Sequence, residues 1–244
     1  MILENFPKVL WINLERSTER RSQTEKLLNE HGINHTRISA VDGLDASRLK
    51  KICHTNKKIS KIQNAITCSH LYALKYFVEQ MSDEKIVVFE DDIDFEFLKY
   101  VPYSTWSEFE INLPPDYNVV QMCTIYPIKN NVEPSVKLVK KDQPIWSACA
   151  YLIKRSAAIN ILQKYMVHDI VNLRKIPPQH AVADFVVYDI DNVYVVPIFT
   201  YQNKDTTNPY HNDHDKLLHH ENNKIRIRYL WILYNLSKLY EVMA

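Results

Sequence analysis

The apolar positions of the chain fall into short continuous runs that alternate with segments of helical spacing. Residues 8–14 (KVLWINL) and 85–89 (KIVVF) are apolar at successive positions, which is typical of strands buried on both faces. Between them, residues 66–81 repeat apolar side chains at the spacing of an amphipathic helix. Alternation of buried strands and helices predicts an α/β fold in which neighbouring strands are parallel.

The rest of the chain continues this pattern. Ser17 or Thr18 can cap a first helix that ends at Gly32, and Ser156 can cap another helix. The polar, lysine-rich residues 48–61 read as a solvated helix and loop. We expect further strands at residues 34–41, 118–125 and 193–201, a β-hairpin of residues 136–140 with 147–154, and helices at residues 157–166 and 216–242. The predicted organisation is one domain over residues 1–214, with residues 215–244 forming a C-terminal helix that packs on it or serves association.

A block of carboxylates follows the strand at residues 85–89. Glu90, Asp91, Asp92 and Asp94 stand where the strand ends, at the sheet edge where open α/β folds bind ligands. Adjacent carboxylates repel one another unless a cation or several hydrogen-bond donors offset the repulsion. The block therefore indicates either a divalent metal site or the acidic first turn of a following helix.

Glycine content separates these two readings. The chain has only two glycines, Gly32 and Gly43, so it cannot contain a dinucleotide-binding glycine turn, a P-loop, a nucleophile elbow or a kinase glycine loop. A bound nucleotide would have its phosphates held by a metal, by basic side chains or by ordinary backbone amides. This favours the metal site.

Charge and cysteine content exclude other classes of function. The net charge is +1, so no overall field attracts nucleic acid. The four cysteines are scattered without a paired motif and read as free buried thiols. We expect no signal peptide and no membrane span, and hence a cytoplasmic protein. The amphipathic C-terminal helix, rich in aromatic residues, packs on its own domain or contacts a membrane surface or a second subunit.

Several separated segments together resemble glycosyltransferase family 25, which includes bacterial lipooligosaccharide galactosyltransferases and collagen hydroxylysine galactosyltransferases. The resemblance implies a GT-A-like nucleotide-sugar-binding fold, a Rossmann-type mixed sheet flanked by helices with a C-terminal helical tail. It further implies Mn²⁺ or Mg²⁺ and inverting transfer of galactose or glucose from a UDP-sugar donor to a hydroxyl of a glycan or hydroxylysine-type acceptor. The segments that carry the resemblance are INLERSTERR at residues 12–21, AVDG at 40–43, CSH at 68–70, FEDD at 89–92 and AYLIKR at 150–155.

The resemblance and the chemistry of the residues together assign the site. Glu90 and Asp92 would bind the metal, with His211 or His214 as a further ligand, and the pair Asp92 and Asp94 is an alternative register. Asp184, an isolated acid among apolar neighbours, would be the base that deprotonates the acceptor, or else a helix N-cap. The residues expected to bind the donor are Asn13, Leu14, Arg16, Arg20, Asp42, Ser69, His70 and Asp91.

Three functions are compatible with these residues. The first is a metal-dependent hexosyltransferase, and the second is an inactive nucleotide-sugar or carbohydrate-binding protein on the same fold. The third, a metal-dependent phosphoesterase, usually needs two metals and more clustered ligands than the chain offers. Retention of Glu90, Asp91, Asp92 and Asp184 favours the active transferase.

Overall fold

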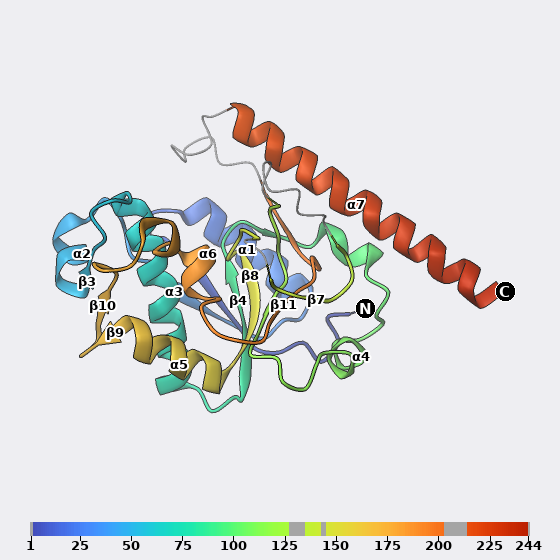
Figure 1. Cartoon of the computed structure of the whole chain (residues 1–244), viewed down its shortest axis with the longest axis horizontal. Coiled ribbons are helices and arrows are strands. Elements are labelled where there is room, and N and C mark those ends of the chain that lie inside the picture. The colour runs from blue at the N-terminus through green and yellow to red at the C-terminus, as the bar shows by residue number, and fades with distance from the viewer. Residues whose placement is uncertain (1, 127–134, 143–144, 203–213, 244) are drawn as a thin grey trace.

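A seven-stranded mixed sheet forms the centre of the protein. The computed structural model describes residues 2–126, 135–142, 145–202 and 214–243, with side chains of the last segment described for residues 218–238 (Figure 1). The order across the sheet is β2-β1-β4-β8-β6-β11-β7. Its strands are β1 (Val9–Asn13), β2 (His35–Ser39), β4 (Lys85–Glu90), β6 (Val119–Gln121), β7 (Val139–Lys140), β8 (Ala150–Lys154) and β11 (Val193–Val195).

Strand direction changes inside this sheet. β1 is parallel to both β2 and β4, and β6 is parallel to β11. β8 lies between β4 and β6 and is antiparallel to both. Two small sheets accompany the large one: β3 (Cys53–His54), β10 (Ile170–Asn172) and β9 (Met166–Val167) form one, and β5 (Ile93–Asp94) and β12 (Thr200–Tyr201) the other.

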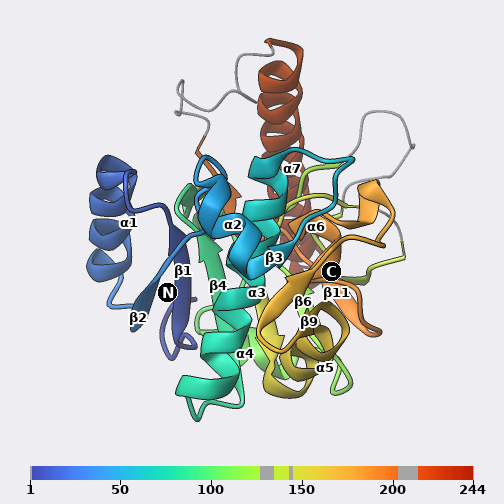
Figure 2. The same ribbon diagram turned by 90° about the vertical axis from the view of Figure 1, so that its left-hand side faces the viewer.

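Helices cover both faces of the large sheet (Figure 2). Side chains that alternate along β4 enter two separate cores, with Val87 and Phe89 in one and Ile86 and Val88 in the other. The first core is closed by α1 (Thr18–Glu30), α4 (Trp106–Ile111), the 3₁₀ helix η1 (Glu96–Tyr100) and α7 (His214–Met243). The second is closed by α2 (Ala46–Ile52), α3 (Lys61–Gln80), α5 (Arg155–Tyr165) and α6 (Ala183–Val186), next to the 3₁₀ helix η2 (Pro178–His180). This arrangement confirms the expected α/β class, a mixed sheet flanked by helices with a C-terminal helix.

Helix ends follow from local chemistry. Ser17 is the N-cap of α1, and Gly32 just beyond its last turn has a φ of 64°, a backbone conformation that favours glycine. Ser60 and Gln63 form a reciprocal capping box at the start of α3. The apolar spacing predicts a helix start at residue 66, whereas this box starts α3 at Lys61.

The predicted hairpin of residues 136–140 with 147–154 is wrong. β7 pairs antiparallel with β11, and β8 pairs with β4 and β6. Proximity along the chain suggested the hairpin, but β8 is apolar on both faces and is almost fully buried, which requires a central position in the sheet.

Three other boundaries also differ from expectation. The predicted strand 193–201 is split into β11 and β12 around Pro197, which has no N–H to donate to a ladder. The strand predicted at 118–125 ends at Gln121, and Ile125 forms only an isolated bridge with Trp146. Lys154, and not Ser156, is the N-cap of α5.

The C-terminal helix α7 lies along one side of the domain. Trp231 is buried and donates from Nε1 to the carbonyl of Pro197 at 3.0 Å, and Asn235 donates to the carbonyl of Tyr100 at 2.8 Å. Arg228 forms an ion pair with Glu96 in η1. None of the helices in the described part of the chain has the length and apolarity that a membrane crossing requires.

Candidate active site

Three strands bring polar residues to one edge of the sheet. β1 and β4 are parallel, so Asn13 and Glu90 stand at their carboxyl ends, and the register pairs Ile12 with Glu90. β8 runs in the opposite direction, so its amino end reaches the same edge, where Phe89 pairs with Ala150. The residues just before β8 therefore meet those just after β4.

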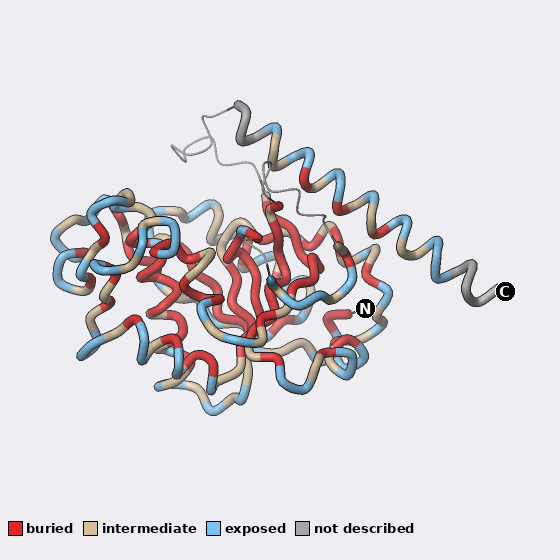
Figure 3. Tube along the Cα trace, in the orientation of Figure 1, coloured by how far each residue is buried: buried red, intermediate tan, exposed pale blue. Residues whose placement is uncertain are grey.

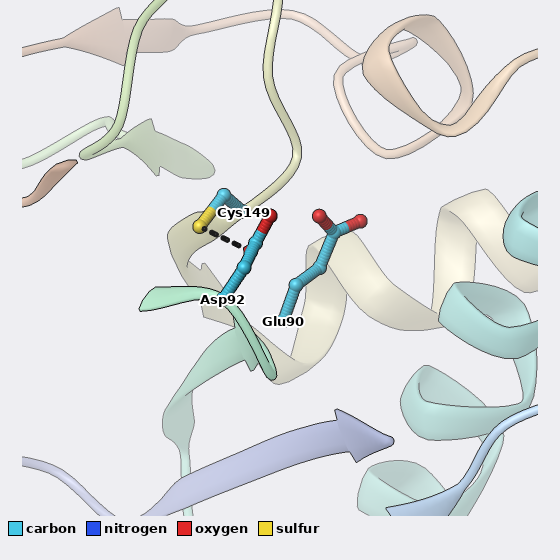
Figure 4. A group of neighbouring side chains, drawn as sticks. All are labelled: Glu90, Asp92 and Cys149. Carbon is cyan, nitrogen blue, oxygen red and sulfur yellow. Dashed lines mark hydrogen bonds between the residues drawn. The ribbon is translucent and has the colours of Figure 1, made fainter. Parts of the chain in front are cut away.

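Glu90, Asp92 and Cys149 form a cluster at this edge (Figure 4). One ligand atom from each lies within 4.8 Å of the other two, and the side chains of Glu90 and Asp92 project in the same direction. The Cys149 thiol donates to Asp92 Oδ1 at 3.3 Å. Among the described residues this is the group of acidic, histidine or cysteine side chains with the geometry of a metal site.

The electrostatics of the cluster fit a divalent cation. Burial, together with the negative charges of Glu90 and Asp91, raises the pKa of Asp92 to about 7. Burial also raises the pKa of Cys149, so this residue is a neutral thiol that acts as a hydrogen-bond donor. Two converging carboxylates that oppose each other's ionisation are a donor set that a hard cation such as Mn²⁺ or Mg²⁺ would relieve.

Asp91 points away from this cluster into the fold. Its Oδ2 accepts a 2.6 Å hydrogen bond from the Asn13 amide, and its Oδ1 forms a 2.9 Å ion pair with Arg20 of α1. Thr24 donates to its backbone carbonyl at 3.0 Å. Asn13, Arg20 and Asp91, all predicted to bind the donor, are thus brought together and hold one another.

His70 contacts Glu90 from α3. It lies on α3, is 1% exposed, and its Nε2 is 2.9 Å from Glu90 Oε1, while its Nδ1 is 3.2 Å from the Tyr151 hydroxyl. Both ring nitrogens are therefore occupied by protein partners. His70 orients one oxygen of Glu90 and leaves the second carboxylate oxygen without this contact.

Asp184 is connected to the cluster through the segment that leads into β8. It lies in the first turn of α6, whose N-cap is Val182, so the alternative N-cap role for Asp184 is wrong. Its Oδ1 accepts a 2.6 Å hydrogen bond from the Ser147 backbone N–H. Ser147 Oγ in turn accepts from the Cys149 N–H at 3.2 Å, and the Cys149 thiol binds Asp92.

The backbone of Ser147 is strained and tightly held. Its φ is 97°, in the region that favours glycine, and such conformations persist where the surroundings impose them. Gln121 Nε2 and the Tyr188 hydroxyl both donate to its carbonyl at 2.9 Å. Burial, and secondarily the charge of Glu90, raises the pKa of Asp184.

A cavity of about 710 Å³ opens beside Asp184. Aromatic and charged side chains share its wall. Lys141 donates to the Ile145 carbonyl at 2.7 Å and lies 4.0 Å from the ring centroid of Tyr188; burial lowers its pKa to about 7. The residues that line the cavity and matter here are Lys141, Asp142, His180, Asp184, Phe185 and Tyr188.

The other predicted site residues lie at the same edge but have structural partners. Arg16 forms a 2.5 Å ion pair with Asp42, which joins the segments after β1 and β2. Ser69 is buried and accepts from the Val41 N–H at 2.8 Å. Leu14 packs against the second core, and its carbonyl accepts from the Ser17 N–H.

The structure does not place the alternative metal ligand Asp94 in the cluster, and it does not describe the side chains of the two predicted histidine ligands. Asp94 accepts from the Glu96 N–H at 2.8 Å at the start of η1 and is not part of the cluster. His211 lies outside the described residues, and so does the side chain of His214. The further metal ligand therefore stays a prediction.

Sequence reasoning missed Cys149 and Ser147. The sequence predicts four free buried thiols, Cys149 among them, and all four are buried. Its place beside Asp92 depends on the antiparallel insertion of β8 next to β4. The local signal for this placement is the continuous apolar run of β8. Such a run is typical of a central strand, and a central β8 places the residues before it at the sheet edge that carries Glu90.

Comparison with known protein families decides the class of the protein. The family model described as glycosyltransferase family 25 (LPS biosynthesis protein) matches residues 6–172, which include β1, the acidic block and β8. The chain belongs to glycosyltransferase family 25. Membership in glycosyltransferase family 25 makes glycosyl transfer its general activity, with a sugar donor and an acceptor as its general partners. The Asp184 region follows the matched residues.

Solved structures are also similar to this family 25 chain. One of them is a glycosyltransferase involved in the glycosylation of the major capsid of PBCV-1, with a TM-score of 0.47 and 11% sequence identity; the match covers 86% of this chain and 98% of that one. Among curated protein sequences, none matches.

Proposed function

We propose that this glycosyltransferase transfers galactose or glucose from a UDP-sugar to a hydroxyl of a glycan acceptor, with inversion and with Mn²⁺ or Mg²⁺. The observation that carries the proposal is the convergence of Glu90 and Asp92 at the carboxyl edge of the sheet, within reach of Asp184 through the segment 147–149. Residues at one edge of the sheet would thus stabilise the leaving group and deprotonate the acceptor.

The donor side of the proposal rests on the acidic cluster. Glu90 and Asp92 would hold the metal, with Cys149 and His70 fixing one oxygen of each carboxylate. The bound metal supplies Lewis-acid stabilisation of the UDP diphosphate as it leaves. Neither glycine offers an alternative phosphate loop, because Gly32 follows α1 and Gly43 packs against the backbone of Ile62 at the start of α3.

The acceptor side of the proposal rests on Asp184. In the transfer, the acceptor hydroxyl gives its proton to Asp184, and its oxygen forms a bond to the anomeric carbon of the sugar. The bond from that carbon to the UDP oxygen breaks, and UDP leaves with the electron pair. The Ser147 N–H fixes Oδ1 of Asp184 and leaves Oδ2 to receive the proton.

The cavity beside Asp184 is the proposed binding site for the acceptor. Its volume of about 710 Å³ lies in the usual range for small-ligand sites. Phe185 packs between Trp146 and His180, which gives the wall an aromatic surface for a sugar ring.

Release of UDP tests the donor assignment directly. The purified protein would be incubated with a panel of nucleotide sugars in Mn²⁺, in Mg²⁺ and in EDTA, with and without glycan or hydroxylysine acceptors. We expect metal-dependent release of UDP from one UDP-hexose, accelerated by a glycan. UDP binding without turnover under all these conditions would instead favour a binding protein.

A pair of neighbouring variants tests the metal site. Asp92→Ala should abolish metal-dependent UDP binding in calorimetry, whereas Asp94→Ala, at an acid outside the cluster that accepts from the Glu96 N–H, should keep it. Equal UDP affinity of the Asp92→Ala variant and the wild type would contradict the metal assignment.

A further inference from the structure

The helix α7 is apolar on two opposite faces, and only one of them is used by the domain. Asn223, Ile227 and Trp231 are at most 6% exposed and face the protein. Figure 3 shows the helix alternating between buried and exposed positions along its length. The opposite face carries large apolar side chains that are 41–59% exposed: Leu218, Ile225, Tyr229, Ile232, Leu233 and Leu236.

These six residues, here called the outer stripe, form one continuous band. Leu218, Ile225, Tyr229, Ile232 and Leu236 follow one another at intervals of seven, four, three and four residues, which keeps them on one side of an α-helix. Leu233 widens the band on one flank. Exposed apolar residues that are scattered singly need no explanation, but a contiguous band on a long helix marks a contact surface.

Charge along the helix indicates what the outer stripe contacts. Residues 218–238 contain four basic residues, Lys224, Arg226, Arg228 and Lys238, and one acidic residue, Glu221. The helix segment therefore has a net charge of +3, and the remaining 26 basic and 28 acidic residues give the rest of the chain −2. A cationic, amphipathic helix is complementary to an anionic lipid surface.

The same charge disfavours a second copy of the chain as the partner. Two helices of charge +3 packed along their outer stripes would repel each other. The intervals of four and three residues in the outer stripe also occur in coiled-coil seams, so the charge is what disfavours this partner.

We propose that α7 binds an anionic membrane surface through the outer stripe and its basic flanks, Arg226 on one side and Arg228 on the other, lying in the plane of the headgroups. The helix does not cross the bilayer, in agreement with its hydropathy over the described residues. Its opposite face stays attached to the domain through Trp231 and Asn235. The inference is independent of the proposed donor and metal, because none of these residues belongs to the candidate active site.

Vesicle co-sedimentation tests this proposal with the full chain. Two vesicle types would be used: phosphatidylcholine alone, and phosphatidylcholine with phosphatidylglycerol in equal parts. We expect binding to the anionic vesicles that weakens as salt is raised, because salt screens the basic flanks. Absence of binding to the anionic vesicles at low salt would overturn the proposal.

Two sets of variants separate the apolar and electrostatic contributions. Ile225→Gln/Ile232→Gln/Leu236→Gln should lower the partition coefficient at least about tenfold. Its matched control, Leu44→Gln/Ile111→Gln/Val167→Gln, alters three exposed apolar residues elsewhere and should bind like the wild type. Arg226→Gln should lower binding to anionic vesicles about fivefold, and the exposed Lys50→Gln is its control.

Three readouts keep the outcomes distinct. Circular dichroism should show the same helix content in all variants, since every altered side chain is exposed. Equal vesicle binding of the outer-stripe variant and its control would overturn the proposal. So would a wild-type dimer in lipid-free sedimentation velocity that the outer-stripe variant converts to a monomer, because the second copy would then be the partner.

Discussion

The Asn13 amide donates a 2.6 Å hydrogen bond to Asp91, linking the carboxyl end of β1 to the turn after β4. Asn13 is 1% exposed, and its side-chain oxygen Oδ1 accepts from Arg37 Nε at 3.0 Å. This contact turns Asp91 away from Glu90 and Asp92. The middle acid of the block is thereby separated from the two that converge.

Replacement of Asn13 by aspartate should weaken both the fold and the site. Asn13→Asp places a second carboxylate against Asp91 and removes a buried donor, so we expect a loss of about 2–4 kcal/mol in the free energy of unfolding. Urea denaturation measures this loss. Asn222→Asp, the same change at an exposed position of α7, should stay within about 0.5 kcal/mol of the wild type. Similar stability of the two variants would contradict the role given to Asn13.

Asp184→Asn should separate transfer from donor binding. The amide oxygen can still accept from Ser147, so the site should keep its shape and its UDP affinity. Without a base, the rate of transfer should fall about 10²–10⁴-fold. Asp142→Asn changes an exposed acid in the wall of the same cavity and should leave the rate nearly unchanged. Normal transfer by Asp184→Asn would exclude it as the base.

Lys141 should make stability depend on alkaline pH. Its pKa in the fold is lowered to about 7 by burial, whereas an unfolded lysine titrates near 10.4. Between these two pKa values the unfolded chain binds more protons than the folded chain. Burial of Lys141 therefore lowers the stability of the fold progressively as pH falls from about 10 to 7.

A Lys141→Met variant tests this dependence. As pH falls from 10 to 7, the stability of this variant should rise by about 1–2 kcal/mol relative to that of the wild type, after allowance for the partial exposure of Lys141. Thermal or urea unfolding of both proteins at several pH values measures the difference. Lys140→Met, at the exposed neighbour, is the control, and parallel pH profiles for wild type and Lys141→Met would contradict the prediction.

Gly43 should tolerate no side chain. A Cβ built there would lie 2.7 Å from the Ile62 Cα at the start of α3, and a backbone atom cannot move aside cheaply. We expect Gly43→Ala to cost about 1–3 kcal/mol of stability. Leu44→Ala, at the neighbouring residue that is 71% exposed, should cost less than about 0.5 kcal/mol. Equal melting temperatures would show that α3 can shift.

The parts of the site that the sequence could predict are those fixed by local pattern. An apolar strand that ends in carboxylates locates Glu90 and Asp92 at a sheet edge without knowledge of the other strands. The isolated acid Asp184 was singled out in the same way, and its burial is consistent with the proton-accepting role proposed for it.

Strand order, in contrast, is a property of the whole chain. Whether residues 147–154 pair with residues 136–140 or enter the sheet beside β4 depends on competition among distant segments, which local pattern does not report. That one difference hid the contacts from Cys149 to Asp92 and from Ser147 to Asp184. Pro197 is the reverse case, a local signal that was present and could have predicted the split between β11 and β12.

The central position of β8 also has a consequence for the order in which the protein assembles. β6 precedes β8 in the chain but reaches β4 only through it, so β2, β1 and β4 share no ladder with β6, β11 and β7 until β8 is inserted. Closure of the sheet thus needs a pairing of long sequence separation between β4 and β8, the kind of step that slows folding. Because β8 also delivers Ser147 and Cys149, the candidate active site and the joined sheet should form in the same step.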